Sequence, residues 1–162
     1  MYRLGLLAAA GMMVASPALA SDWYLHSGDR DCSLTPQMCS VMEAGMMDLT
    51  RSFVITYARP KDTLRKIGIG PGRLLVSGQI SNGVFVGTAY RYKMYGDTRC
   101  ELPYQVTGIV LPHQNFVLHG AAPAFARSRC TDDGYSTNND QYVLNFYYVG
   151  SGSNIPDASF RE

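Results

Sequence analysis

The chain lacks a surplus of charge of either sign, and this absence narrows its range of partners. Of its 14 Lys and Arg only Arg3 precedes residue 21, so 13 basic residues face 13 Asp and Glu in the remainder. A protein that binds a phosphate backbone needs a basic cluster, and no run of basic residues is present. We therefore expect no nucleic acid among the partners of this protein.

Long apolar runs are also lacking, apart from one at the N-terminus. It extends from Leu4 to Val14, follows the basic Arg3 and precedes Ala18-Leu19-Ala20, which has the A-x-A form of a cleavage site. The run is too short to span a bilayer as a stable helix. We predict a signal peptide over residues 1–20, export of a soluble chain to the periplasm or beyond the cell, and no membrane insertion after signal removal.

Motifs that carry chemistry are missing as well. The three histidines, His26, His113 and His119, show neither H-x-x-x-H nor H-E-x-x-H spacing. The segment 78–83 is one residue too long for a serine nucleophile elbow. The segment GIGPG at 68–72 lacks the Lys-Ser/Thr ending of a phosphate-binding loop. The sequence therefore predicts no catalytic residue, no bound metal and no cofactor.

Carboxylates are sparse in the contexts where hydrolases use them. Glu43 and Glu101 are the only glutamates before the last residue, and neither lies in a segment that suggests burial. A glycosidase needs two carboxylates held several ångströms apart. The acidic segment 132–140 offers hard oxygen ligands but does not match the EF-hand pattern, so we interpret it as a polar turn.

Four cysteines are present, and in an exported chain they predict two disulfides. Their spacing lacks the paired C-x2-4-C of structural zinc sites. Four cysteines allow three connectivities. Because short loops close most readily, the pairs Cys32–Cys39 and Cys100–Cys130 are favoured over the two other connectivities.

Alternating apolar residues then predict an all-β fold. Asn82-Gly83 is a strong hairpin signal between two such segments, and no internal repeat or domain boundary is visible. We expect a single domain over residues 21–149, an antiparallel meander of six or seven strands that forms a small barrel or a curled sheet. A flexible tail over 150–162 would follow. The predicted strands cover 52–58, 73–80, 84–94, 101–111, 116–120 and 141–149.

Two finer expectations concern the facing of one strand and a possible helix. In 84–94 both charges, Arg91 and Lys93, share a face with Phe85, so the opposite face is expected to be the core face. It consists of Val84, Val86, Thr88, Tyr90, Tyr92 and Met94. Methionines at a spacing of four, beginning at Met38, predict a short N-terminal helix that starts near Thr35.

Tyrosines are abundant, with ten of the eleven in the mature chain. Rings with polar tips can line a cleft for a sugar or another small ligand, but β-strands also favour tyrosine at half-buried positions. Both interpretations remain open. If one group binds a ligand, Tyr147 and Asn145 are the candidates, because their face of the last strand is less uniformly apolar than the other.

The order of segments resembles a group of small exported bacterial proteins without an assigned activity. The resemblance rests on LLVSGQ, VFVGTAYRYK, YQVTG, VLHGAAP and YVLNFYYV, with one cysteine after the G-T-A-x-x-aromatic strand and another after the G-x-A-P segment. It covers roughly residues 50–149. The resemblance implies the β architecture and the Cys100–Cys130 pairing, and it implies no activity.

These observations favour a non-catalytic exported module of the cell envelope that binds a small ligand or an envelope protein. The alternative is an envelope hydrolase that acts on glycan or peptide. Its base would come from a set of five side chains, which are His26, His113, His119, Glu43 and Glu101.

Overall fold

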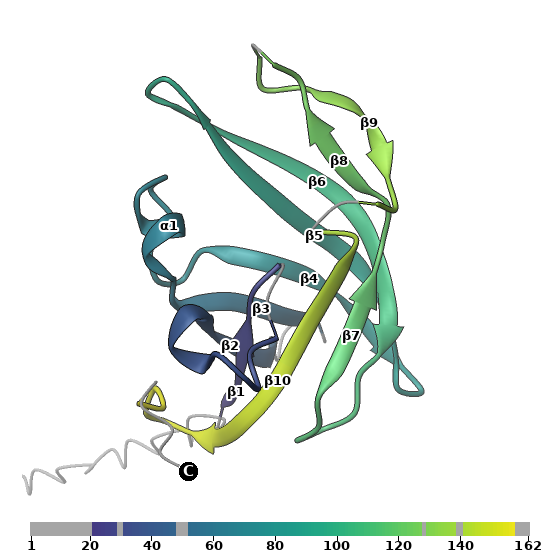
Figure 1. Cartoon of the computed structure of the whole chain (residues 1–162). Helices are drawn as coiled ribbons and strands as arrows, with labels where there is room; N and C mark the ends of the chain where they lie inside the picture. The colour runs from purple at the N-terminus through teal and green to yellow at the C-terminus, as the bar shows by residue number, and fades with distance from the viewer. Residues whose placement is uncertain (1–20, 29–30, 48–51, 128, 139–140, 158–162) are drawn as a thin grey trace, which may run out of the picture.

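The protein is an antiparallel β-barrel with a small second sheet (Figure 1). The computed structural model describes residues 21–157 except 29–30, 48–51, 128 and 139–140, so the predicted signal peptide lies outside the described residues. Eight strands close the barrel in the order β1-β10-β7-β6-β5-β4-β3-β2. They are β1 (Ser21–His26), β2 (Ser40–Met47), β3 (Ser52–Arg59), β4 (Leu74–Ser81), β5 (Val84–Tyr95), β6 (Thr98–Ile109), β7 (Phe116–His119) and β10 (Val143–Gly152).

The remaining elements project from this barrel. Strands β8 (Ala122–Phe125) and β9 (Asp132–Ser136) form a separate two-stranded sheet in the segment of chain that connects β7 to β10. The one α-helix among the described residues, α1 (Asp62–Arg65), is a single turn between β3 and β4. The prediction of an all-β antiparallel meander is confirmed, and the sheet is a closed barrel. The count of six or seven strands was too low.

The low count has its origin in two segments. Residues 132–136, which the sequence predicts to be part of a polar turn, form strand β9. The other segment is N-terminal. Four consecutive residues of β1, from Trp23 to His26, are buried, so this strand shows no alternation in the sequence. The predicted helix is wrong: only a three-residue 3-10 turn, η1 (Pro36–Met38), is present, and Met42 lies on β2. Strand β2 pairs with β1 on one side and β3 on the other. These main-chain partners outweigh the local four-residue spacing of the methionines.

Aromatic side chains fill the interior of the barrel. Phe116 stacks on Phe146 with ring centroids 4.7 Å apart, and Tyr24 meets Phe116 edge-on at 5.0 Å. Leu118 and Leu144 are fully buried beside them. A barrel of eight strands has an interior just wide enough for side chains to fill. The barrel interior is therefore a packed core among the described residues.

The expected facing of β5 is wrong. Phe85 and Ala89 are fully buried, whereas Val84 and Val86 are 46% and 59% exposed. The error has a topological cause. Strand β5 pairs with β4 only over Val84–Ala89, but it continues with β6 as far as Tyr95. The charged residues that follow Ala89 therefore share the inward face and yet lie outside the packed barrel.

The Asn82-Gly83 hairpin and both favoured disulfides are confirmed. Asn82 and Gly83 have φ values of 52° and 78°, as the turn type preferred by Asn-Gly requires. Cys32 and Cys39 are bonded with Cα atoms 6.0 Å apart, and Cys100 and Cys130 with Cα atoms 5.0 Å apart. Two disulfides indicate an oxidising compartment outside the cytoplasm. No helix in the described part of the chain is long and apolar enough to cross a membrane.

Candidate ligand site at the barrel mouth

A cavity of about 1240 Å³ lies at one end of the barrel, which we call the mouth. Helix α1, the outer part of β5 and the β8–β9 hairpin extend beyond the closed strands of the barrel (Figure 1). Residues from each of them line the cavity. One wall combines the end of β1 with the segment closed by the Cys32–Cys39 disulfide. Helix α1 with its preceding loop forms a second wall. The outer half of β5 and the β8–β9 hairpin form a third.

The lining of the mouth is strongly basic. Five of its described residues are Lys or Arg, and one is acidic. That carboxylate, Asp62, forms an ion pair with Arg65 of the same helical turn. Charges that balance over residues 21–162 are therefore unequal here. The basic residues of the lining are Arg59, Lys61, Arg65, Arg91 and Lys93.

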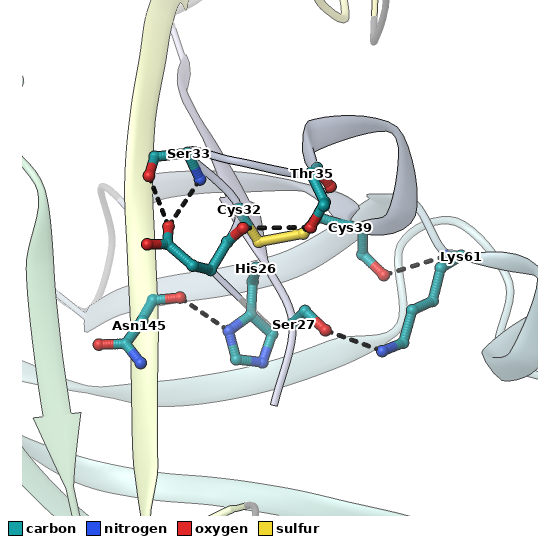
Figure 2. The surroundings of a disulfide bond; sticks show 10 residues. His26, Ser27, Cys32, Ser33, Thr35, Cys39, Lys61 and Asn145 are labelled. Atoms are coloured by element: carbon teal, nitrogen blue, oxygen red, sulfur yellow. Dashed lines mark hydrogen bonds between the residues drawn. A yellow bond between two sulfur atoms is a disulfide. The ribbon is translucent and has the colours of Figure 1, made fainter. Parts of the chain in front are cut away.

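Lys61 is held in place by two buried serines (Figure 2). Its Nζ donates to Ser27 Oγ at 3.0 Å, and its main-chain N–H donates to Ser40 Oγ, also at 3.0 Å. Both serines are almost inaccessible to solvent and line the same cavity. The hydrogen bonds anchor the ammonium group at the junction of the first two walls.

His26 is a neutral member of the same lining. It is 4% exposed, and its ring stacks on Phe146 with centroids 4.8 Å apart. Its Nδ1–H donates to the main-chain oxygen of Asn145 at 2.9 Å, because a carbonyl can only accept (Figure 2). The pKa of His26 is lowered to about 4, chiefly by burial and also by nearby Lys61, against the opposing effect of the Asn145 hydrogen bond. The imidazole is therefore uncharged at neutral pH.

Arg91 and Lys93 are the basic residues of the third wall. An N–H of Arg91 donates to the main-chain oxygen of Pro123 at 2.6 Å, and its guanidinium lies 5.5 Å from the centroid of Phe125. The ammonium of Lys93 lies 4.8 Å from the ring centroid of Tyr95 and 5.8 Å from that of Phe125. These contacts brace the β8–β9 hairpin against β5.

Tyrosines complete the lining. Tyr57, Tyr90 and Tyr92 all border the cavity. Burial raises the pKa of Tyr57 above its usual range, and it raises the pKa of Tyr92 to about 12. The hydroxyl of Tyr92 donates to the main-chain oxygen of Leu74. Tyr57 also belongs to the core cluster, as Tyr24 does, and Tyr92 packs against that cluster. These rings therefore lie where the core meets the mouth.

The residues singled out as ligand candidates from the sequence lie elsewhere. Tyr147 is half-buried on β10 against an outer cluster that includes Trp23 and Leu25. Burial raises the pKa of its phenol, as does its hydrogen bond to Asp31. Asn145 contributes its main-chain oxygen to His26. Neither residue lines the mouth, and ligand binding by this pair stays a prediction.

A second polar cluster places Ser151, His113 and Asp22 together on the surface, with Tyr148. Ser151 Oγ and Asp22 Oδ1 both lie 3.1 Å from the same ring nitrogen of His113, its Nδ1. Ser151 also donates directly to Asp22. A catalytic triad needs the serine and the carboxylate on opposite nitrogens of the imidazole. The arrangement is therefore a hydrogen-bond network without the geometry of a proton relay.

The other candidate bases of the hydrolase alternative are dispersed over the fold. His119 lies against Tyr142 with ring centroids 6.0 Å apart. Glu43 accepts a hydrogen bond from Ser21 Oγ at 2.6 Å, and Glu101 forms an ion pair with Arg73. Of the five side chains in that set, His26 lines the mouth. Over the described residues, no group of three or more His, Cys, Asp and Glu could hold a metal ion.

Comparisons with family models, with curated protein sequences and with solved structures found no match. The sequence pattern did not predict a cavity at the mouth, because it placed Arg91 and Lys93 on the face of their strand opposite to the core. One available signal was the length of β5. A strand that is longer than its pairing with one neighbour must project beyond the barrel. Basic residues on its inward face then line the cavity beyond the barrel end.

Proposed function

We propose that this protein is a non-catalytic binding domain that acts outside the cytoplasm and takes up a small ligand at the barrel mouth. The observation that carries the proposal is the cavity of about 1240 Å³ beyond a filled barrel interior. Mouths of β-barrels are common ligand sites, and cavities of several hundred Å³ or more suit small organic molecules. The polar and aromatic groups around this cavity can orient such a ligand.

The walls of the mouth are held in position by cross-links before any ligand arrives. Cys39 lines the cavity and is bonded to Cys32. The Cys100–Cys130 bond ties the start of β6 to the segment before β9. Walls that are already ordered reduce the entropy lost on binding. Two disulfides at one end of the barrel therefore support a binding role for that end.

A neutral aromatic fluorophore, phenylnaphthylamine, tests the proposal with the mature chain. We expect saturable binding with one molecule per chain. Ala124→Trp places an indole in the cavity from β8 and should weaken this binding at least about tenfold by excluding the probe. Leu34→Trp is the matched control, because Leu34 is exposed and does not line the cavity.

Fluorescence titration measures the binding, and circular dichroism verifies that each variant is folded. Two results contradict the proposal. One is a folded wild-type chain that binds neither this probe nor its sulfonated analogue, anilinonaphthalene sulfonate, saturably. The other is an Ala124→Trp variant that binds as well as the Leu34→Trp control.

A further inference from the structure

We propose that the ligand of the mouth is a small organic anion, held by basic side chains on two walls while its body lies against tyrosine rings. This inference rests on the binding function proposed above and names the chemical class of the ligand. Its anionic group would be a carboxylate, phosphate or sulfonate, because these match the hydrogen-bond donors of lysine and arginine.

The distribution of charge is the first argument. The mature chain contains 13 basic and 13 acidic residues, but the described lining of the mouth contains five basic residues and one acidic residue. A concave surface with charges of one sign concentrates the field and attracts ions of the opposite sign. The Asp62 carboxylate offsets little of this field, because Arg65 already pairs with it.

Lys61 supplies the second argument. Its ammonium uses one donor on the Ser27 hydroxyl, and an ammonium has three. No carboxylate of the described residues lies within ion-pair distance of Lys61. Ser27 and Ser40 hold the side chain and the main chain of Lys61 in place. An anion at this position would meet a charge that is already oriented.

The third argument is the second basic wall. The contacts of Arg91 with Pro123 and Phe125 fix its guanidinium beside the cavity. The guanidinium brings a positive charge to this side of the cavity. Lys61 and Arg91 come from different elements, the β3–α1 loop and β5. They therefore bring positive charge to the cavity from two directions.

The uncharged groups of the lining are also compatible with an anion. His26 is neutral and the phenols of Tyr57 and Tyr92 stay protonated, because burial shifts each pKa away from the charged form. These side chains add no negative charge that would repel an anion. Their rings offer flat apolar surface to the body of the ligand.

Two probes with the same aromatic skeleton test the inference. Anilinonaphthalene sulfonate carries one negative charge, whereas phenylnaphthylamine is neutral. With the folded mature chain at low salt, we expect the anionic probe to bind at least about tenfold more tightly. This difference should shrink as sodium chloride is added, because salt screens the interaction.

Variants then locate the charge. The double substitution Lys61→Gln with Arg91→Gln should weaken binding of the anionic probe at least about tenfold. The affinity for the neutral probe should stay within about twofold of the wild-type value. Lys66→Gln removes a neighbouring exposed lysine that does not line the cavity, and it should change neither affinity. If the double variant fails to fold, Lys93→Gln replaces it, since Lys93 is exposed and lines the mouth.

The outcomes separate the inference from the function on which it rests. If the neutral probe binds and the anionic probe binds no more tightly, the mouth is a ligand site but the inference is wrong. If the charge variants lose affinity for both probes to the same degree, the inference is also wrong. Failure of both probes to bind the folded chain would contradict the binding function itself.

Discussion

At the scale of single residues, burial determines which side chains at the mouth carry charge. His26 is enclosed by Phe146 and the main chain of β10, so the protonated imidazole would lose its hydration. Lys61 lies close by at the cavity surface and is only partly buried. The same end of the barrel thus contains a neutral imidazole and an oriented ammonium.

The burial of His26 predicts acid-dependent stability. Its pKa is about 4 in the folded chain and 6.5 in the unfolded chain. Above pH 6.5 both states hold the neutral ring, so the group has no effect on stability there. As the pH falls from 6.5 to 4, the unfolded chain binds a proton that the folded chain excludes, and the free energy of unfolding decreases by on the order of 3 kcal/mol.

Urea unfolding at several pH values measures this effect, with His26→Asn as the comparison. Asparagine can still donate to the Asn145 carbonyl but does not titrate, so the variant should lose less stability between pH 6.5 and 4. Carboxylates that contribute to acid unfolding are common to both proteins and cancel. Equal losses in the two proteins would show that His26 is not buried in its neutral form.

At the scale of elements, the contact between β4 and β5 depends on two glycines. Gly78 and Gly87 face each other as register partners, and the ring of Phe85 packs over both. A Cβ atom at Gly87 would fall inside van der Waals distance of the main-chain oxygen of Ser77 and of the Phe85 ring. The absence of side chains here allows the close approach of the two strands and places Phe85 in the core.

We therefore expect Gly87→Ala to destabilise the barrel by about 1–3 kcal/mol, the usual cost of overpacking. Gly45→Ala is the matched control on β2, because a Cβ there meets no atom within 4 Å. The control substitution should change the free energy of unfolding little, since replacing glycine restricts the unfolded chain without creating a clash. Urea unfolding of both variants gives the comparison, and equal stabilities would contradict the close approach of β4 and β5.

At the scale of the whole molecule, barrel closure depends on the pairing of the two chain ends. Strand β1 pairs with β10 from Ser21↔Gly152 to His26↔Phe146. Trp23 is 4% exposed, and its Nε1–H donates to the main-chain oxygen of Gly152 at 3.1 Å. Strand β10 thus extends beyond residue 149, where the sequence predicts the flexible tail to begin. Residues 150–152 belong to the barrel wall.

Two truncations test this closure. A chain that ends at residue 149 loses the last part of the β1–β10 ladder and the Trp23 hydrogen bond, so it should be less stable by roughly 2 kcal/mol or more. A chain that ends at residue 157 retains both and should match the full mature chain. Unfolding monitored through the single Trp23 measures the difference, and equal stabilities would contradict a role of residues 150–152 in closure.

Much of the fold could be predicted because its signals are local. Alternation identified the strands from β3 to β7 and β10, and the Asn82-Gly83 pair identified its hairpin because both residues tolerate positive φ. Loop length favoured the correct cysteine pairs. Each inference uses only residues near one another in the chain, or the compartment in which the chain is expected to fold.

The tertiary structure decided the rest, for reasons that are not local. Segment 40–47 is a strand because β1 and β3 supply partners on both sides. The face of β5 that points inward depends on the glycines of the β4–β5 contact. The basic lining of the mouth depends on the extension of β5 beyond its pairing with β4. The sequence by itself determined the expectation of an exported β-domain with two disulfides. Only closure of the barrel decided which side chains are enclosed and which surround the cavity, because burial arises from contacts between distant segments.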